Sequence, residues 1–315
     1  MSGDLERIRD ALHYIPASDR HTWYKMGMAI KSELGDTGFD MWEAWSQQDE
    51  SFDPSAARDV WKSIRAGGKV TAGTLFYEAK AHGWRDDGLH QKPTPEELEK
   101  RRRDAADRAK QEQAETAREH AEAAKKSAMI WKAGKLASAD HPHPYNVRKG
   151  VSPVATLREI DADAAAAILG YVPKSKGEPL AGRLLIVPVK VGDALSTLEL
   201  IDGDGRKSAI AGGAKAGGYW AAQPLQDAVE TLLIAEGVAT SLSGMEASGH
   251  PVIAALSASN LPAVAKIMRE RFPAAVLVIL ADLVKATGLP DPHAIEAARS
   301  VGGLVALPNF RRAAA

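Results

Sequence analysis

The sequence predicts a mixed α/β protein with a small all-α domain first, then a long charged helical linker, and a parallel-sheet domain at its C-terminal end. Three observations lead to this prediction. The 315 residues are more than one hydrophobic core usually organises. Aromatic residues gather in residues 1–85, whereas charged residues and alanine dominate residues 86–130. After residue 229, short apolar runs alternate with helical patterns, which is typical of a parallel sheet covered on both faces.

The composition is that of a globular protein and excludes several classes of site. Hydrophobic residues make up 45% and charged residues 26%, close to the average for folded domains. With no cysteine, the chain has no disulfide, thiol nucleophile or zinc ribbon, and a reducing compartment is favoured. No apolar stretch approaches the roughly 18 residues of a membrane span, so we predict a cytoplasmic protein. The formal net charge of −1 means that any nucleic-acid site must be local.

Residues 1–85 predict a helical domain with a large aromatic core. Asp53 and Pro54 have the pattern of an N-cap followed by proline in the first helical turn. The large side chains favour a buried core over exposed rings that stack on bases, because so small a domain needs them to bury area. Among the aromatic residues of this domain are Trp23, Tyr24, Trp42, Trp45, Trp61, Phe76, Tyr77 and Trp84.

Residues 86–130 predict a helical spacer. Opposite charges four residues apart, such as Glu99 and Arg103, support a helix that is solvated on all sides. The helix is then expected to dock onto the second domain through apolar residues after Ala128. His141 and His143 alternate with proline, which favours a turn before a docked Tyr145 over a metal site.

Residues 131–228 predict a β-rich subdomain. Leu184 to Val189 form a continuous apolar run, Ser196 to Ile201 alternate, and Asp202 to Gly205 form a hairpin turn between strands. The turn lacks the remaining ligands of a calcium-binding loop at their spacing.

Residues 229–315 alternate between strands and helices. The predicted strands are Thr231–Ala235, Val252–Leu256, Ala275–Ala281 and Leu304–Leu307, and the predicted helices are Val238–Ala247, Leu261–Arg271 and Pro292–Val301. Ligands gather at the carboxyl ends of such strands. Glu236 and Asp282 directly follow two of them, and hard carboxylate oxygens suit Mg²⁺ (or Mn²⁺). Ser257, Ser259 and Asn260 follow a third strand and are predicted to line the same crevice, or to cap a helix.

Two stretches resemble known families. The first is the run from His21 to Ile30 with Phe39–Ser46 and Ala57–Trp61, which resembles the helical primase C-terminal module, type 2, of plasmid and phage replication proteins. The second is the run from Glu230 to Thr240, with Ala281 and Asp282 after it, which resembles the Toprim domain of primases, topoisomerases and some nucleases. This resemblance implies a Rossmann-like sheet in residues 229–315.

The Toprim resemblance also implies roles for the carboxylates. Glu236 takes the place of the family's glutamate, as a metal ligand or general acid/base, and Asp282 that of the first acid of its Asp-x-Asp motif. The second acid is replaced by Val284. Asp291 or His293 then substitutes as a ligand, or one ion binds, or catalysis is lost.

The run from Gly182 to Val189 resembles the basic subdomain of bacterial primases. That resemblance implies that Arg183, Lys207 and Lys215 hold phosphates of template or nucleotide, and the alternative is that they are ordinary surface cations. Asn260 and Lys285 complete the predicted nucleic-acid contacts.

The function predicted is a Mg²⁺-dependent, primase-like nucleotidyltransferase of a mobile genetic element. Its substrates would be single-stranded DNA and NTPs, with a replicative helicase or another replication protein as partner. A Toprim nuclease and a non-catalytic replication module that binds DNA or recruits a partner are the alternatives, and Val284 favours the latter.

Overall fold

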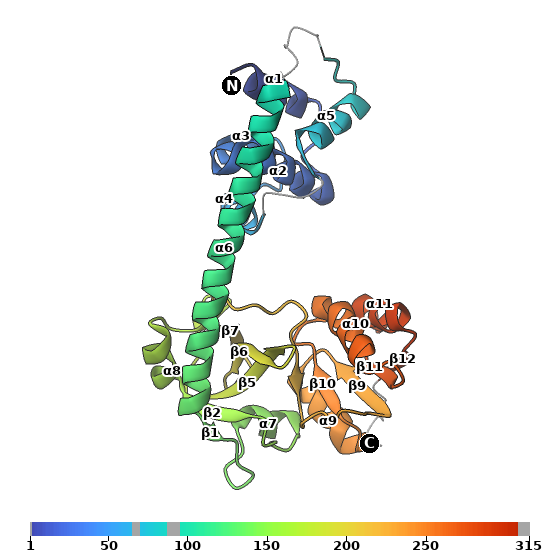
Figure 1. Cartoon of the computed structure of the whole chain (residues 1–315). Coiled ribbons are helices and arrows are strands. Elements are labelled where there is room, and N and C mark those ends of the chain that lie inside the picture. Colours follow the sequence, from blue (N-terminus) through green and yellow to red (C-terminus); the bar gives the residue numbers. More distant parts are fainter. Residues whose placement is uncertain (1, 65–69, 87–94, 308–315) are drawn as a thin grey trace. The chain divides into compact units, whose positions relative to one another are not determined.

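The computed structural model describes residues 2–64, 70–86 and 95–307, and the chain divides into two compact units, Met1–Thr116 and Ala117–Ala315. Each unit has hydrophobic clusters of its own. In these described ranges no helix has the length and apolarity that crossing a membrane requires. The mixed α/β class predicted from the sequence is confirmed, with helices first and sheets after them (Figure 1).

The first unit contains short helices packed around indole rings. They are α1 (Ser2–His13), α2 (Arg20–Leu34), the 3-10 helix η1 (Gly35–Gly38), α3 (Phe39–Ser46), α4 (Pro54–Ser63) and α5 (Ala72–Ala81). The predicted cap at Asp53 is confirmed, because its side chain accepts a hydrogen bond from the Ala56 N–H at 2.6 Å, with Pro54 in the first turn.

The tryptophans of this unit form its core. Trp42 is completely buried, and its ring centroid lies 4.4 Å from that of Trp23 and 5.3 Å from that of Trp61. The Trp45 indole N–H donates to the Ile15 carbonyl at 2.9 Å, so the polar edge of this buried ring is satisfied. Two of the predicted core aromatics are instead exposed, since Tyr24 and Tyr77 lie on the outward faces of α2 and α5.

One helix, α6 (Pro95–Ala133), contains residues 95–130 of the predicted linker, and residues 87–94 of the linker lie outside the described residues. Its exposed ion pair between Glu99 and Arg103, at 3.4 Å, has the predicted spacing. The helix is not solvated all round, however. Ala123, Ser127 and Ile130 are buried, because this last part of α6 covers one face of the antiparallel sheet in the second unit.

The antiparallel sheet has the order β1-β2-β5-β6-β7. Its strands are β1 (Lys135–Leu136), β2 (Arg158–Asp161), β5 (Arg183–Val191), β6 (Ala194–Ile201) and β7 (Lys207–Ala209), with α7 (Pro144–Lys149), α8 (Ala162–Leu169) and the small pair β3 (Lys174–Ser175) and β4 (Glu178–Pro179) between them. The predicted hairpin turn is confirmed, since the Gly205 N–H donates to the Asp202 carbonyl at 3.0 Å.

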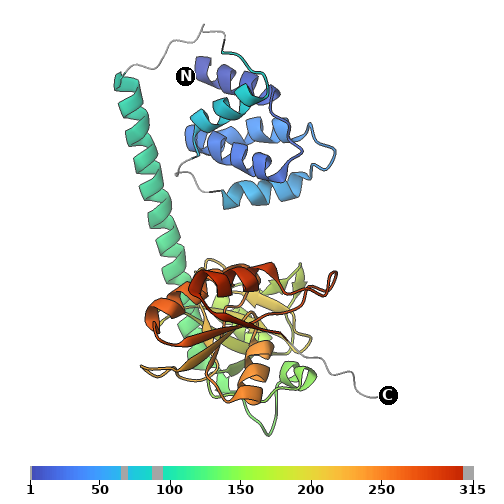
Figure 2. The ribbon, with the colours of Figure 1, turned by 90° about the vertical axis from the view of Figure 1, so that its right-hand side faces the viewer.

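The second sheet has the order β12-β11-β9-β10-β8, and all its pairs are parallel except that of β8 with β10. Its elements are β8 (Trp220–Ala221), β9 (Thr231–Ala235), α9 (Val238–Ser248), β10 (Val252–Ala254), η2 (Ala258–Asn260), α10 (Leu261–Arg271), β11 (Val276–Leu280), α11 (Pro292–Val301) and β12 (Leu304–Ala306). Helices α10 and α11 pack on one face and α9 on the other (Figures 1 and 2). The predicted parallel sheet with helices on both faces is therefore present.

Successive side chains of β5 and β6 point to opposite faces of the antiparallel sheet, so each strand contributes to two different clusters. Residues 185, 187, 189 and 201 of β5 and β6 form one cluster with Val238 and Leu242 of α9, whereas residues 184, 186, 198 and 200 pack under α6 and α8. Glu199 has the same parity as Ile201, so it lies on the face of β6 that is turned toward α9 and the parallel sheet. A charged side chain thus lies among the apolar residues on the inner face of this sheet.

Candidate functional site

Glu236 and Asp282 lie at the carboxyl ends of neighbouring parallel strands. Strands β9 and β11 pair directly, with Ala235 opposite Leu280. Glu236 is therefore the first residue beyond its strand and Asp282 the second beyond its own, on strands about 4.8 Å apart. Glu236 is half-buried and Asp282 is exposed. The predicted placement of both carboxylates at one edge of the sheet agrees with the structure.

A closed loop brings a third carboxylate to this edge. The Asp291 N–H donates to the Asp282 carbonyl at 2.9 Å, and the Val284 N–H donates to the Leu289 carbonyl at 2.8 Å. Residues 283–290 therefore leave and re-enter the sheet edge as a short hairpin. Val284 serves in the hairpin backbone, while Asp291 returns beside Asp282 and caps α11, where its carboxylate accepts from the His293 N–H at 2.8 Å.

The charges around Glu236 are mainly negative. Burial raises the pKa of Glu236 above its ordinary value, and the carboxylates of Asp282 and Asp291 raise it further. Lys207 and His293 lower the same pKa, but less. This combination is the one expected where acidic groups are held together to receive a cation or a proton.

The acidic edge fits a magnesium ion better than a metal that needs a complete protein cage. Within residues 2–64, 70–86 and 95–307, no three histidine, aspartate or glutamate side chains converge as a ready metal cage. Mg²⁺ usually keeps several waters and takes only one or two carboxylates together with substrate phosphates. Glu236 and Asp282 provide such a pair, and the Thr240 hydroxyl donates to Asp282 at 3.4 Å, which orients the second carboxylate.

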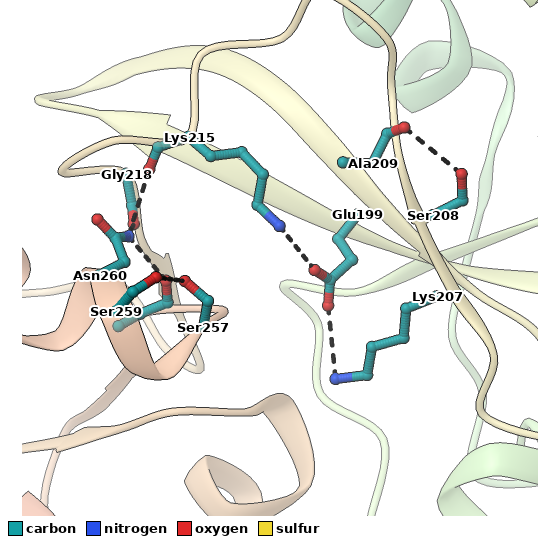
Figure 3. Close-up of polar contacts among 10 residues, drawn as sticks. Glu199, Lys207, Ser208, Ala209, Lys215, Gly218, Ser257, Ser259 and Asn260 are labelled. Atoms are coloured by element: carbon teal, nitrogen blue, oxygen red, sulfur yellow. Dashed lines mark hydrogen bonds and ion pairs between the residues drawn. The ribbon is translucent and has the colours of Figure 1, made fainter. Parts of the chain in front are cut away.

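Two lysines meet on the buried Glu199 next to this edge. Lys207 Nζ lies 3.5 Å from Glu199 Oε1, and Lys215 Nζ lies 3.0 Å from Oε2 (Figure 3). A side chain added at Gly237 would begin 4.0 Å from Lys207 Nζ, so this ammonium group faces the turn between β9 and α9. The structure thus brings two of the predicted phosphate ligands, Lys207 and Lys215, to one cluster close to Glu236.

Asn260 holds the loop that carries Lys215. Its side-chain amide donates to the carbonyls of Lys215, Gly218 and Ala255 at 3.2, 2.8 and 2.8 Å, and its oxygen accepts from the Gly217 N–H at 2.8 Å. Figure 3 shows Asn260 reaching toward this loop, with Ser257 and Ser259 beside it. The side chain that we predicted to contact nucleic acid is fully used in fixing this loop.

Arg183 and Lys285 form no hydrogen bond or ion pair with Glu199, Lys207 or Lys215. Arg183 bonds to Glu159 at 3.1 Å and to the carbonyls of His141 and Pro142 at 3.2 and 3.1 Å. Lys285 is exposed on the hairpin after β11, and its side chain makes no hydrogen bond or ion pair within the described ranges. Their predicted contacts with nucleic acid remain predictions.

The histidines before α7 have a structural role. His143 is buried, its Nδ1 accepts from the Tyr145 N–H at 3.2 Å and its Nε2 lies 2.8 Å from the Arg183 carbonyl. Both ring nitrogens are occupied, so His143 caps the helix, and Tyr145 after it is buried as predicted.

Sequence reasoning missed Glu199. The signal was present, because Glu199 stands in the middle of the strand Thr197 to Ile201, all of which is buried. A glutamate is almost never fully buried unless it is paired. That rule, applied to the predicted strand, indicates a cationic partner for Glu199.

Comparison with known proteins relates part of this chain to primases. Residues 8–79 match the model of the family described as Primase C terminal 2, which confirms the resemblance predicted for the N-terminal domain. Two curated relatives, both DNA primase TraC of Escherichia coli, are 39% identical to this chain over 89 residues, or 26% of its length. The aligned part spans only 8% of one relative and 6% of the other.

A solved structure gives a weaker likeness. It is the bacteriophage T7 lagging-strand DNA polymerase interacting with primase domains bound to an RNA/DNA hybrid and dTTP. One of its chains overlays on 58% of this chain and 83% of its own length, with a TM-score of 0.37 and 16% identity. A score this low does not establish a common fold.

Proposed function

We propose that this chain is a DNA primase-like nucleotidyltransferase whose C-terminal unit is a Mg²⁺-dependent Toprim domain. One observation carries the proposal: Glu236 and Asp282 follow adjacent parallel strands, beside two lysines held on Glu199. Negative groups that hold a cation next to positive groups that hold phosphate are the two parts that nucleotidyl transfer requires.

The reaction assigns different work to the two halves of the site. The 3′-hydroxyl of one nucleotide attacks the α-phosphorus of the next, a new P–O bond forms, and pyrophosphate leaves with the electrons of the broken P–O bond. Bound Mg²⁺ would supply charge stabilisation for the attacking and leaving oxygens. Asp282 serves as a ligand, Glu236 serves as a ligand or accepts the hydroxyl proton, and Lys207 and Lys215 neutralise phosphate oxygens.

The primase reading of the whole chain rests on the relatives as well as on the site. The match to the Primase C terminal 2 family and the identity to DNA primase TraC support primer synthesis over other Toprim reactions. Single-stranded DNA and NTPs as substrates, a helicase or other replication protein as partner, and a role in a mobile element are part of this proposal.

Primer synthesis on single-stranded DNA tests the proposal. Labelled NTPs are incubated with the template and Mg²⁺ or Mn²⁺, and oligonucleotide products are resolved on a gel. Glu236→Gln and Asp282→Asn should each lower the rate by about 100-fold or more, because loss of one transition-state stabiliser costs about 10²–10³ in kcat. Glu230→Gln is the matched control, since Glu230 is exposed at the opposite end of the same strand and should keep the wild-type rate.

The same assay separates the alternatives. Template scission without oligonucleotide synthesis would identify a nuclease. A non-catalytic module would make neither product. In calorimetry it would also show no Mg²⁺ or Mn²⁺ binding that depends on Asp282, so the wild type and Asp282→Asn would give the same result. The replacement of the second motif acid by Val284 is the feature that favours this last reading.

A further inference from the structure

Glu199 is a buried acid with two basic partners, one for each carboxylate oxygen. It is 4% exposed, with Lys207 at Oε1 and Lys215 at Oε2. Burying a carboxylate is costly unless it is paired, and one lysine would be enough to balance its charge. The second lysine leaves the cluster with one positive charge in excess. An excess cation held beside a buried acid is an arrangement suited to an anionic ligand.

The three side chains come from elements that are separately fixed. Glu199 is in β6, which is the middle strand of the antiparallel order β5-β6-β7. Lys207 is the first residue of β7, paired opposite Ile201. Lys215 lies on the loop that the Asn260 amide fastens through its hydrogen bonds to Lys215 and Gly218. The sheet and the loop therefore fix the backbone position of each lysine, and the contact with Glu199 fixes the position of each ammonium group.

The ammonium groups have donors to spare. Each lysine carries three N–H donors. Lys215 uses one of them in its hydrogen bond to Glu199 Oε2, whereas Lys207 is held near Oε1 as an ion pair at 3.5 Å without a hydrogen bond, so donors of both remain for another acceptor. The side chains of Lys207 and Lys215 remain 38% and 33% exposed, so an anion has access to both. Lys207 also faces the backbone turn at Gly237, directly after Glu236. A phosphate bound by the pair would lie beside the acidic edge.

We infer that Glu199 is a positioning residue: it holds the ammonium groups of Lys207 and Lys215 as a preformed pair for the polyphosphate of an incoming nucleotide. This inference rests on the proposed nucleotidyl transfer. A free lysine loses up to about 2 kcal/mol of side-chain entropy when it is immobilised on a ligand. Because Glu199 already immobilises the lysines in the folded protein, this entropy is lost during folding and not when the ligand binds.

Calorimetric titration with inorganic tripolyphosphate, in the absence of template and divalent metal, tests the pair directly. Glu199→Gln keeps the shape of the side chain but removes its charge, and it should weaken binding by about 10-fold. Lys207→Gln and Lys215→Gln should each weaken binding as much or more. Asp202→Asn is the matched control, because Asp202 is a buried carboxylate directly after the same strand and forms a similar ion pair, with Arg206, which is not a predicted phosphate ligand. That variant should bind as the wild type does.

Two further measurements distinguish positioning from a structural ion pair. Glu199→Gln added to a Lys207→Gln/Lys215→Gln variant should change the affinity no further, because Glu199 acts only through these lysines. In primer synthesis, Glu199→Gln should raise the KM for NTP about 10-fold with a smaller change in kcat, and Glu199→Asp should restore most of the loss. Should Glu199→Gln fail to fold, Glu199→Asp and the lysine variants still provide the comparison.

The outcomes separate this inference from the proposed function. Tripolyphosphate binding by Glu199→Gln that equals or exceeds that of the wild type, while the lysine variants bind weakly, would overturn the positioning role and leave primer synthesis untouched. A wild-type chain that binds tripolyphosphate through Glu199 and both lysines, but makes no primer, would overturn the proposed function alone.

Discussion

At the scale of single residues, some buried polar groups of the described ranges have partners that explain their burial, whereas others, such as the Asn146 amide and the Ser241 hydroxyl, make no hydrogen bond there. His143 is an example of the first kind, because its two ring nitrogens join a helix start to the Arg183 carbonyl. Burial lowers the pKa of His143 below its ordinary value of 6.5. Since the unfolded chain protonates this histidine more readily than the folded chain does, folding stability depends on pH.

His143 is expected to destabilise the fold as the pH falls. Its contribution is complete above pH 6.5 and is lost progressively as the pH drops from 6.5 toward the lower pKa of the folded state. His143→Asn keeps a side chain that can cap α7 but does not titrate. The difference in free energy of unfolding between wild type and this variant should therefore shrink from pH 7 to pH 5, as measured by urea denaturation. His141→Asn, a change at the exposed neighbour, should retain the wild-type pH dependence, and an identical slope for all three proteins would contradict the argument.

Residue-level prediction from sequence worked where a side chain follows directly from a strand and failed where its partner is distant in sequence. Glu236 and Asp282 could be placed because the end of an apolar run marks the sheet edge. The pairing of Glu199 with Lys215 depends on a hairpin and on a loop fastened by Asn260, which no local pattern reveals. Asn260 itself was predicted as a ligand for nucleic acid, whereas its amide is used to hold the backbone.

At the scale of elements, α6 combines two different helix environments. Its first turns carry the exposed ion pair between Glu99 and Arg103, whereas Ala123, Ser127 and Ile130 are buried against the antiparallel sheet. The charge pattern before residue 120 predicted a solvated helix, and the described side chains of that part are exposed or half-buried. The buried stripe that follows was underestimated because alanine and serine supply little hydrophobic signal.

Ile130→Ala should therefore destabilise the second unit, although Ile130 belongs to the linker in the sequence-based division. Removal of a fully buried isoleucine side chain costs about 2–5 kcal/mol. Met129 is the matched control, because it is the preceding residue of the same helix and is 49% exposed, so Met129→Ala should cost less than about 1 kcal/mol. Guanidinium denaturation curves of the two variants provide the comparison. Equal small losses would show that α6 is only a spacer.

The parallel sheet was the most predictable element of the fold. Short apolar runs bounded by glycine and helical patterns gave β9, α10 and α11 their observed bounds. Strand β8 was missed because its two residues, Trp220 and Ala221, join the sheet antiparallel to β10 without any periodic pattern. The short strands β1 and β2 were not predicted either, because they are defined by pairing with partners far along the chain.

At the scale of the whole molecule, the chain contains two compact units with separate cores. The Primase C terminal 2 match lies within the first unit, and the proposed catalytic edge lies within the second. The first core depends on the tilted indole contacts of Trp42 with Trp23 and Trp61, and the second on two sheets that pack with α9 between them. A change in the first core is therefore a test of whether the proposed chemistry depends on it.

Trp42→Ala should lower the stability of the first unit by about 3–5 kcal/mol, because it removes a completely buried ring. Calorimetric unfolding of the wild-type chain should show two transitions, of which only one moves to lower temperature in the variant. Tripolyphosphate binding near Glu199 should keep its wild-type affinity, since every side chain proposed for that site lies beyond residue 116. A shift of both transitions, or a loss of tripolyphosphate affinity comparable to that expected for Lys215→Gln, would show that the two units are energetically coupled. In that event the primase-related module would take part in forming the site, and its role would have to be sought in the chemistry as well as in recruitment.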